Sequence, residues 1–130
     1  MIITIDFDGT LDRKDVQEYV KRIIMDKHDI YILTSRYDDL HAQNYKLNPQ
    51  NNDLYEVANW LNIPKHQIIF TNMRSKYEYL FNSIVDIHIE NDEVEIEEIL
   101  HYTKTNCIDV NKKDWIENAD IVIKELVNAE

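Results

Sequence analysis

The strongest constraint on the fold is a regular alternation of short β-branched runs with longer amphipathic stretches. Apolar runs predict five strands, at residues 2–5, 30–33, 68–70, 84–89 and 106–110. Apolar spacing predicts helices between them, at residues 14–26, 54–61, 76–81, 93–102 and 114–127. Strands that alternate with helices form parallel crossovers. The sequence therefore predicts an α/β fold, a three-layer Rossmann-like sandwich with a mainly parallel five-stranded sheet.

The length and charge of the chain narrow its class. A chain of 130 residues suits one domain covering residues 1–130. The net charge of −11 repels nucleic acid phosphates and anionic membranes at long range. Cys107 is the single cysteine, so no internal disulfide forms, and its place in an apolar run predicts a structural thiol. The first residues lack a signal-peptide pattern, so we expect a cytoplasmic protein without a membrane span.

A long polar stretch at residues 37–52 predicts a loop. It contains Asn48-Pro49, a turn-forming pair, and Asp53 follows it as the expected cap of the next helix. His88 lies within an apolar run, which predicts that it is packed rather than catalytic. The single glycine excludes phosphate-cradling glycine loops and dinucleotide-binding motifs.

The most informative segment for chemistry directly follows the first predicted strand and reads Asp6-Phe7-Asp8-Gly9-Thr10. Gly9 is the only glycine, which predicts a positive φ or a close backbone approach at that position. Two carboxylates so close together repel unless a cation or a proton compensates. Mg²⁺ takes oxygen ligands and also neutralises phosphate. One carboxylate can then attack phosphorus while the other transfers a proton.

This segment resembles the DxDGT signature of haloacid dehalogenase (HAD) phosphatases. The resemblance implies that Asp6 forms an aspartyl-phosphate and binds Mg²⁺. It implies that Asp8 protonates the leaving oxygen, later deprotonates water, and offers its backbone carbonyl to the metal. On this basis we expect a magnesium-dependent phosphatase, in which Gly9 and Thr10 also contribute to phosphate binding.

Two further segments resemble the second and third motifs of the same family. Thr34-Ser35-Arg36 follows the second predicted strand, and Thr34 matches the family's catalytic hydroxyl. A hydroxyl there can donate to a phosphoryl oxygen, and Ser35 and Arg36 are candidate phosphate contacts. Lys76 starts a predicted helix after the third strand and matches the family's lysine, although Arg74 competes for that role.

The fourth motif departs from the common pattern. The family places two Asp residues after the fourth strand, whereas this chain has Glu90, Asn91 and Asp92. We expect these three residues, with Asp6 and Asp8, to be the metal ligands. The competing interpretation is that Asp92 caps the next helix and Glu90 is merely exposed.

Neither gap between the first three motifs is long enough for a cap domain, so the resemblance is to capless members. The loop at residues 37–52 is the only candidate lid, through Tyr37, His41, Tyr45 and Lys46. We expect a small-molecule or nucleic-acid-end phosphate as substrate. Two alternatives compete: a catalytically weak HAD-fold binding module, and a response-regulator receiver. The receiver is disfavoured because no Asp ends the third predicted strand.

Overall fold

A computed structural model describes residues 1–46 and 51–130 of the chain. Its strands are β1 (Ile2–Ile5), β2 (Asp29–Thr34), β3 (Ile68–Phe70), β4 (Ile87–Glu90) and β5 (Asn106–Asp109). Its α-helices are α1 (Lys14–Met25), α2 (Asp39–Asn44), α3 (Asn52–Trp60), α4 (Tyr77–Leu80), α5 (Glu93–Tyr102) and α6 (Trp115–Asn128). Two short helical turns complete the set, η1 (Phe7–Leu11) and η2 (Lys65–Gln67).

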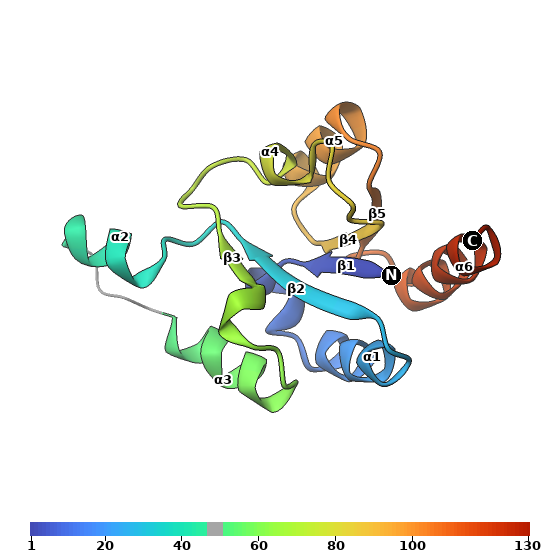
Figure 1. Cartoon of the computed structure of the whole chain (residues 1–130), viewed down its shortest axis with the longest axis horizontal. Helices are drawn as coiled ribbons and strands as arrows, with labels where there is room; N and C mark the ends of the chain where they lie inside the picture. The colour runs from blue at the N-terminus through green and yellow to red at the C-terminus, as the bar shows by residue number, and fades with distance from the viewer. Residues whose placement is uncertain (47–50) are drawn as a thin grey trace.

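The five strands form one sheet in the order β3-β2-β1-β4-β5, and every neighbouring pair is parallel. The predicted α/β Rossmann-like fold is therefore confirmed (Figure 1). The order reverses between β1 and β4, which is the place where ligands bind in open α/β sheets. Receiver domains share the flavodoxin order 2-1-3-4-5. The strand order thus removes the receiver interpretation.

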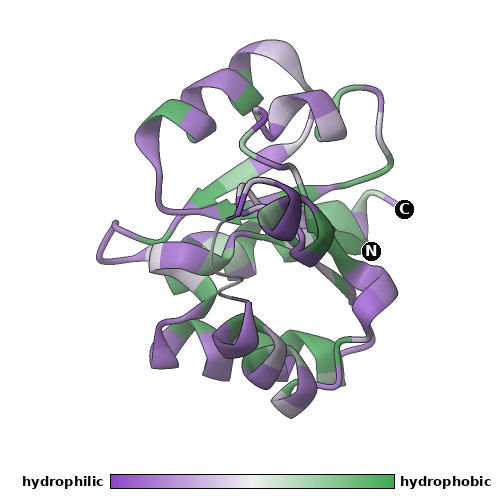
Figure 2. Ribbon diagram, turned by 90° about the vertical axis from the view of Figure 1, so that its left-hand side faces the viewer, coloured by the Kyte–Doolittle hydropathy of each residue, from purple (hydrophilic) through white to green (hydrophobic). Residues whose placement is uncertain are grey.

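The sheet is covered on both faces by helices, as Figure 1 shows. The larger core joins α1, α3 and α6 to alternate strand residues such as Ile5 and Ile89. A smaller core on the opposite face joins Leu33 of β2 to Leu80 and Ile99, from α4 and α5. Hydrophobic segments gather at the centre of the molecule and hydrophilic ones dominate its outer turns (Figure 2). Within the described ranges, no helix is long and apolar enough to cross a membrane.

The structure corrects three expectations. Most of the other predicted helix and strand boundaries lie within two residues of the observed ones. The polar stretch at residues 37–52 contains a helix, α2, because the Asp38 side chain accepts the backbone N–H of His41 as an N-cap. Residues 47–50 of that stretch lie outside the described residues. Asp53 does not cap α3, which already begins at Asn52. The fourth strand starts at Ile87 rather than at residue 84, because Ile84 is 78% exposed and finds no core to join.

The sequence allowed two interpretations of Asp92, as a metal ligand or as the cap of the helix that follows it, α5. The Asp92 carboxylate accepts the backbone N–H groups of Val94 and Glu95, at 2.9 and 3.2 Å. Asp92 is therefore the N-cap of α5 and satisfies two of the amide groups that a helix start leaves unpaired.

This cap predicts the effect of two substitutions. Asp92→Ala should lower the free energy of unfolding by about 0.5–2 kcal/mol, the usual cost of losing a capping side chain. Asp92→Asn should retain most of that stability because asparagine caps as well as aspartate. Urea unfolding followed by circular dichroism measures both. Glu93→Ala, at the exposed neighbouring position, is the control; an equal loss in that variant would contradict the capping role.

Candidate active site

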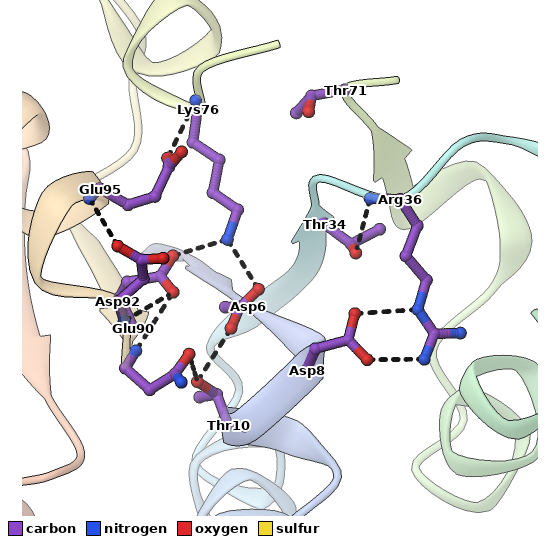
Figure 3. Close-up of polar contacts among 12 residues, drawn as sticks. Asp6, Asp8, Thr10, Thr34, Arg36, Thr71, Lys76, Glu90, Asp92 and Glu95 are labelled. Atoms are coloured by element: carbon purple, nitrogen blue, oxygen red, sulfur yellow. Dashed lines mark hydrogen bonds and ion pairs between the residues drawn. The ribbon is translucent and has the colours of Figure 1, made fainter. Parts of the chain in front are cut away.

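Asp6 lies at the carboxyl end of the central strand and is only 4% exposed. Its backbone N–H donates to the carbonyl of Ile89 at 3.0 Å, which joins the end of β1 to β4. Its carbonyl accepts the N–H of Leu11 at 3.1 Å, which closes the turn η1 over it. The parallel pairing of β1 with β4 thus sets Asp6 beside Glu90, the last residue of β4 (Figure 3).

Lys76 joins these two carboxylates. Its Nζ lies 2.7 Å from Asp6 Oδ1 and 2.7 Å from Glu90 Oε1, and the residue is 2% exposed. The competing Arg74 points outward instead, where it pairs with Glu78. The structure therefore brings Lys76, and not Arg74, to the first motif. Figure 3 shows the lysine reaching down between the two acids.

Glu90 is fully buried and its carboxylate accepts four hydrogen bonds. Oε1 accepts from Lys76 Nζ and from His88 Nε2, the latter at 2.8 Å. Oε2 accepts the backbone N–H groups of Asn91 and Asp92, at 3.2 and 3.3 Å. A carboxylate offers about four lone-pair positions, so each one has a donor. The interpretation of Glu90 as merely exposed is wrong.

The two carboxylates share one ammonium group, and their pKa values move in opposite directions. Burial raises the pKa of Asp6 to about 7; Lys76 opposes this rise and the charge of Glu90 adds to it. Burial also acts to raise the pKa of Glu90, but hydrogen bonds and charges from His88 and Lys76 outweigh it and lower that pKa to about 2. Burial disfavours the charge of Lys76, yet its two acidic partners raise its pKa. Glu90 is thus the permanent anion, and Asp6 is the group that can take up a proton.

Asn91 completes an oxygen-rich cluster next to Asp6. One terminal atom of its amide lies 2.8 Å from Asp6 Oδ2, 3.0 Å from the Asp8 carbonyl and 3.2 Å from Glu90 Oε2. The hydroxyl of Thr10 is 3.1 Å from the same atom. With nitrogen at that position, the amide donates to these oxygens. This orientation satisfies the amide and its neighbours. Rotation of the amide about its terminal bond would turn its oxygen toward the same oxygens, which are the ligand type that Mg²⁺ takes.

These oxygen atoms are of the chemical type that the expected metal binds. Asp6, the Asp8 carbonyl and Asn91 offer hard oxygen ligands, and Glu90 Oε2 borders them. Asp92 is placed differently, because its Oδ1 accepts the amides of α5. Over residues 1–46 and 51–130, no three His, Cys, Asp or Glu side chains form a metal-binding group. The candidate set therefore depends on neutral carbonyl and amide oxygens as much as on carboxylates.

Gly9 has the conformation that the sequence predicted. Its φ is +77°, in the left-handed region that favours glycine, and its N–H donates to Asp12 at 3.1 Å. A Cβ at this position would overlap with the amide of Asn91. Glycine is thus required for two reasons, the turn of the backbone and the close approach of Asn91.

Asp8 faces the opposite way from Asp6 and pairs with Arg36 (Figure 3). The guanidinium donates to both carboxylate oxygens of Asp8, at 2.7 and 2.9 Å, and reaches Asp53 of α3 at 2.8 Å. Hydrogen bonds to Asp53 and Asp8 raise the pKa of Arg36 above its ordinary value. Arg36 also lies over the ring of Phe7. The Asp8 side chain is 55% exposed, against 6% for Asp6.

The second motif lies at the end of β2, next to β1. Thr34 is fully buried, and its hydroxyl accepts the backbone N–H of Arg36 at 3.3 Å. Its carbonyl accepts the N–H of Thr71 at 2.8 Å, which ties the ends of β2 and β3 together. Ser35 is half-buried, and its carbonyl accepts the N–H of Met73. Thr34 and Ser35 thus stand at the same sheet edge as Asp6 (Figure 3 for Thr34).

The described residues of the candidate lid contact one another. The rings of Tyr37 and Tyr45 pack edge to face at 5.4 Å, and Tyr45 remains 61% exposed. His41 pairs with Asp38 at the start of α2. Lys46 is exposed and has a φ of +55°. In the described part of the chain, Tyr37 and Tyr45 contact each other and His41 contacts Asp38, so these side chains pair within the loop rather than with Asp6 or Lys76.

Three residues that the sequence did not suggest also contact the site. Glu95 of α5 accepts the backbone N–H of Lys76 at 3.1 Å, and Asp53 holds Arg36. Thr4 lies 2.7 Å from the ring of His88, which in turn holds Glu90. The pairing of Thr4 with His88 follows from strand register, which a single sequence does not contain.

Cys107 stays a structural thiol, since burial raises its pKa to about 12.

Comparisons with known proteins add no family assignment. No protein-family model and no curated protein matches this sequence. The case for a function therefore rests on the residues of the four motifs and on their geometry.

The raised pKa of Asp6 predicts how stability changes with pH. A pKa of about 7, against the ordinary 3.8, means that the folded state holds the Asp6 proton more tightly than the unfolded chain. This contribution to stability is complete below pH about 4 and is lost as the pH rises through 7. The Asp6→Asn variant has no titrating group at this position, so its stability should not fall for this reason as the pH rises. The melting temperature of Asp6→Asn should therefore match wild type near pH 4 and exceed it at pH 8, in buffer with a chelator.

A matched control separates this effect from a general loss of negative charge. Asp29→Asn removes an exposed carboxylate from β2, and its difference from wild type should be small and independent of pH. Parallel curves for wild type and Asp6→Asn between pH 4 and 8 would contradict the raised pKa.

Proposed function

We propose that this chain is a magnesium-dependent phosphomonoester hydrolase of the HAD type, with Asp6 as its nucleophile. The observation that carries the proposal is the convergence of four motif segments at one sheet edge. Asp6, Lys76 and Glu90 form a buried cluster there with 2.7 Å contacts, and Thr34 ends the neighbouring strand. The four motifs follow one another along the chain in the order of the family that the first motif resembles, and they lie at one edge of the sheet.

The first chemical step is attack on phosphorus. An oxygen of ionised Asp6 forms a bond to phosphorus as the bond from phosphorus to the leaving oxygen breaks. Lys76 uses two of its three N–H groups on Asp6 and Glu90, which leaves one for a phosphoryl oxygen. The hydroxyl of Thr34 serves a second oxygen. Such donors stabilise the charge that develops in the transition state.

Asp8 transfers the protons in both steps. It donates a proton to the leaving oxygen in the first step, then accepts one from water as the water attacks phosphorus. The bond from phosphorus to Asp6 breaks and inorganic phosphate leaves. Asp8 must first release at least one oxygen from Arg36. Arg36 is thus well placed to exchange its Asp8 contact for a phosphate contact.

The metal would be held by Asp6, the Asp8 carbonyl and Asn91, with Glu90 Oε2 beside them. When bound, Mg²⁺ would neutralise phosphate oxygens and keep Asp6 ionised.

The exposure of the two aspartates bears on the substrate class. Asp6 is buried while Asp8, which serves the leaving group, is more than half exposed. The phosphoryl group would therefore react inside the site while the leaving group extends outward. That arrangement suits a nucleotide or a polynucleotide end as well as a smaller phosphomonoester. The single cysteine, which forms no internal disulfide, favours a cytoplasmic site of action.

A catalytically weak HAD-fold binding module is the second candidate. The observation that favours it is the fourth motif, where Asn91 is neutral and Asp92 caps a helix. Fewer charges would then face the metal than in the common family pattern. This protein would bind phosphate compounds with Mg²⁺ but turn them over slowly.

The phosphatase proposal predicts two different responses to leaving-group quality. Asp6→Asn should abolish hydrolysis of every phosphomonoester, because no nucleophile remains. Asp8→Asn should lower kcat for an alkyl phosphate by roughly 10²–10⁴-fold, the usual contribution of general acid catalysis. An aryl phosphate with a good leaving group needs no proton, so its loss in the first step should be much smaller. Single-turnover release of the leaving alcohol or phenol, with Mg²⁺ present, measures the first step for both substrates.

The same assay decides between the two candidate functions. Asp29→Asn, at an exposed acid at the start of β2, is the matched control and should retain turnover. Binding of a nucleotide with Mg²⁺ by wild type in calorimetry, without any phosphate release, would support the binding module instead. Equal losses of Asp8→Asn for both leaving groups would contradict the acid role of Asp8.

A further inference from the structure

The buried polar cluster continues beyond the proposed catalytic residues to His88 and Thr4. His88 is fully buried; its Nε2 lies 2.8 Å from Glu90 Oε1 and its Nδ1 lies 2.7 Å from the hydroxyl of Thr4. His88 and Glu90 are two positions apart on β4, so they share one face of the sheet. Thr4 is the register partner of His88 on β1. The series Thr4–His88–Glu90–Lys76–Asp6 therefore spans two strands without a gap.

The chemistry of this series fixes which ring nitrogen carries the proton. An ionised Glu90 only accepts, so Nε2 must be the donor toward it. A ring that carries its proton on Nε2 alone has an acceptor at Nδ1. The Thr4 hydroxyl then donates to Nδ1. Thr4 and Glu90 thus favour the same tautomer of His88.

His88 also decides whether Glu90 is completely paired. Glu90 Oε1 has two donors, Lys76 and His88, while both amide donors serve Oε2. Without His88, a fully buried carboxylate oxygen would lose one of its two donors. Glu90 could then turn away from Lys76, and the ammonium would close on Asp6 alone.

We propose that His88 is a positioning residue for the reaction: its Nε2–H holds Glu90 so that Lys76 stays shared between Glu90 and Asp6. This inference rests on the proposed function, because sharing matters only if Lys76 must serve a phosphoryl oxygen. The residue touches no reacting atom. It acts through Glu90 on Lys76, and Thr4 acts through its ring.

Kinetics of three variants test the role. His88→Leu removes the donor, whereas His88→Gln keeps an amide N–H near the position of Nε2. With an aryl phosphate and Mg²⁺, His88→Leu should lower kcat by roughly 10–100-fold, as losses of such supporting contacts do. KM should stay within about twofold, because the missing interaction acts in the transition state. His88→Gln should recover most of kcat. Thr4→Val, a milder change, should lower kcat less than His88→Leu.

The control for general destabilisation is Ile99→Val, in the small core on the same face of the sheet. It should leave kcat unchanged at a temperature where all variants are folded by circular dichroism. An equal loss in Ile99→Val, an unchanged kcat in His88→Leu, or a His88→Gln variant as slow as His88→Leu would each overturn the proposal.

Nitrogen-15 NMR of this 15.6 kDa chain tests the contact without any turnover. The His88 ring should give the Nε2–H pattern in wild type and in Thr4→Val, because Glu90 remains its acceptor, but the Nδ1 signal should shift in Thr4→Val, which lacks the hydroxyl donor. A slowly exchanging Lys76 ammonium signal should be present in wild type and His88→Gln but broadened in His88→Leu. If wild type hydrolyses no phosphate yet shows these signals, the proposed function fails while the positioning contact stands. A Lys76 signal that is the same in His88→Leu as in wild type would overturn the contact itself.

Discussion

One buried ammonium group, that of Lys76, sits between two carboxylates, and the arrangement of the site depends on it. Asp6 comes from β1, Glu90 from β4 and Lys76 from the start of α4, so the three charges tie together both sides of the strand-order reversal. Two acids and one base leave a surplus negative charge in a region with little water. Burying such a charge is costly unless a proton or cation compensates it. Burial raises the pKa of Asp6, whereas His88 and Lys76 outweigh burial at Glu90 and keep its pKa low.

The two aspartates of the first motif are two residues apart yet occupy opposite environments. Asp6 is enclosed by β4, η1 and Lys76, whereas Asp8 meets water and a guanidinium on the surface. Gly9 allows the chain to turn between them while Asn91 approaches the backbone. Carboxylates of one chemical type acquire different roles when their surroundings differ in this way. The same turn that separates the aspartates also aims the Asp8 carbonyl at the oxygen cluster.

The sequence predicted most of the fold because buried parallel strands read as continuous apolar runs. β1 and β3 match their predicted bounds, and the positive φ of Gly9 was expected from its being the only glycine. Helix α2 was missed because its six residues are too few to show a period, although Asp38 carried a cap signal. The choice of Lys76 over Arg74 depends on how the turn after β3 rotates the chain. The role of His88 depends on what lies opposite on β1, and pairing across strands is not encoded locally.

The strand order has a consequence for how the chain is made. β1 is synthesised before both of its neighbours; β2 follows soon afterwards, but β4 comes much later. Thr4 and His88, which meet across that edge, are 84 residues apart along the chain. Until residues 87–90 have emerged, β1 offers an open apolar edge with unpaired backbone groups, the kind of template on which chains mispair. The growing chain is therefore most exposed to aggregation in that interval, and the arrival of β4 ends it in the same event that buries Asp6.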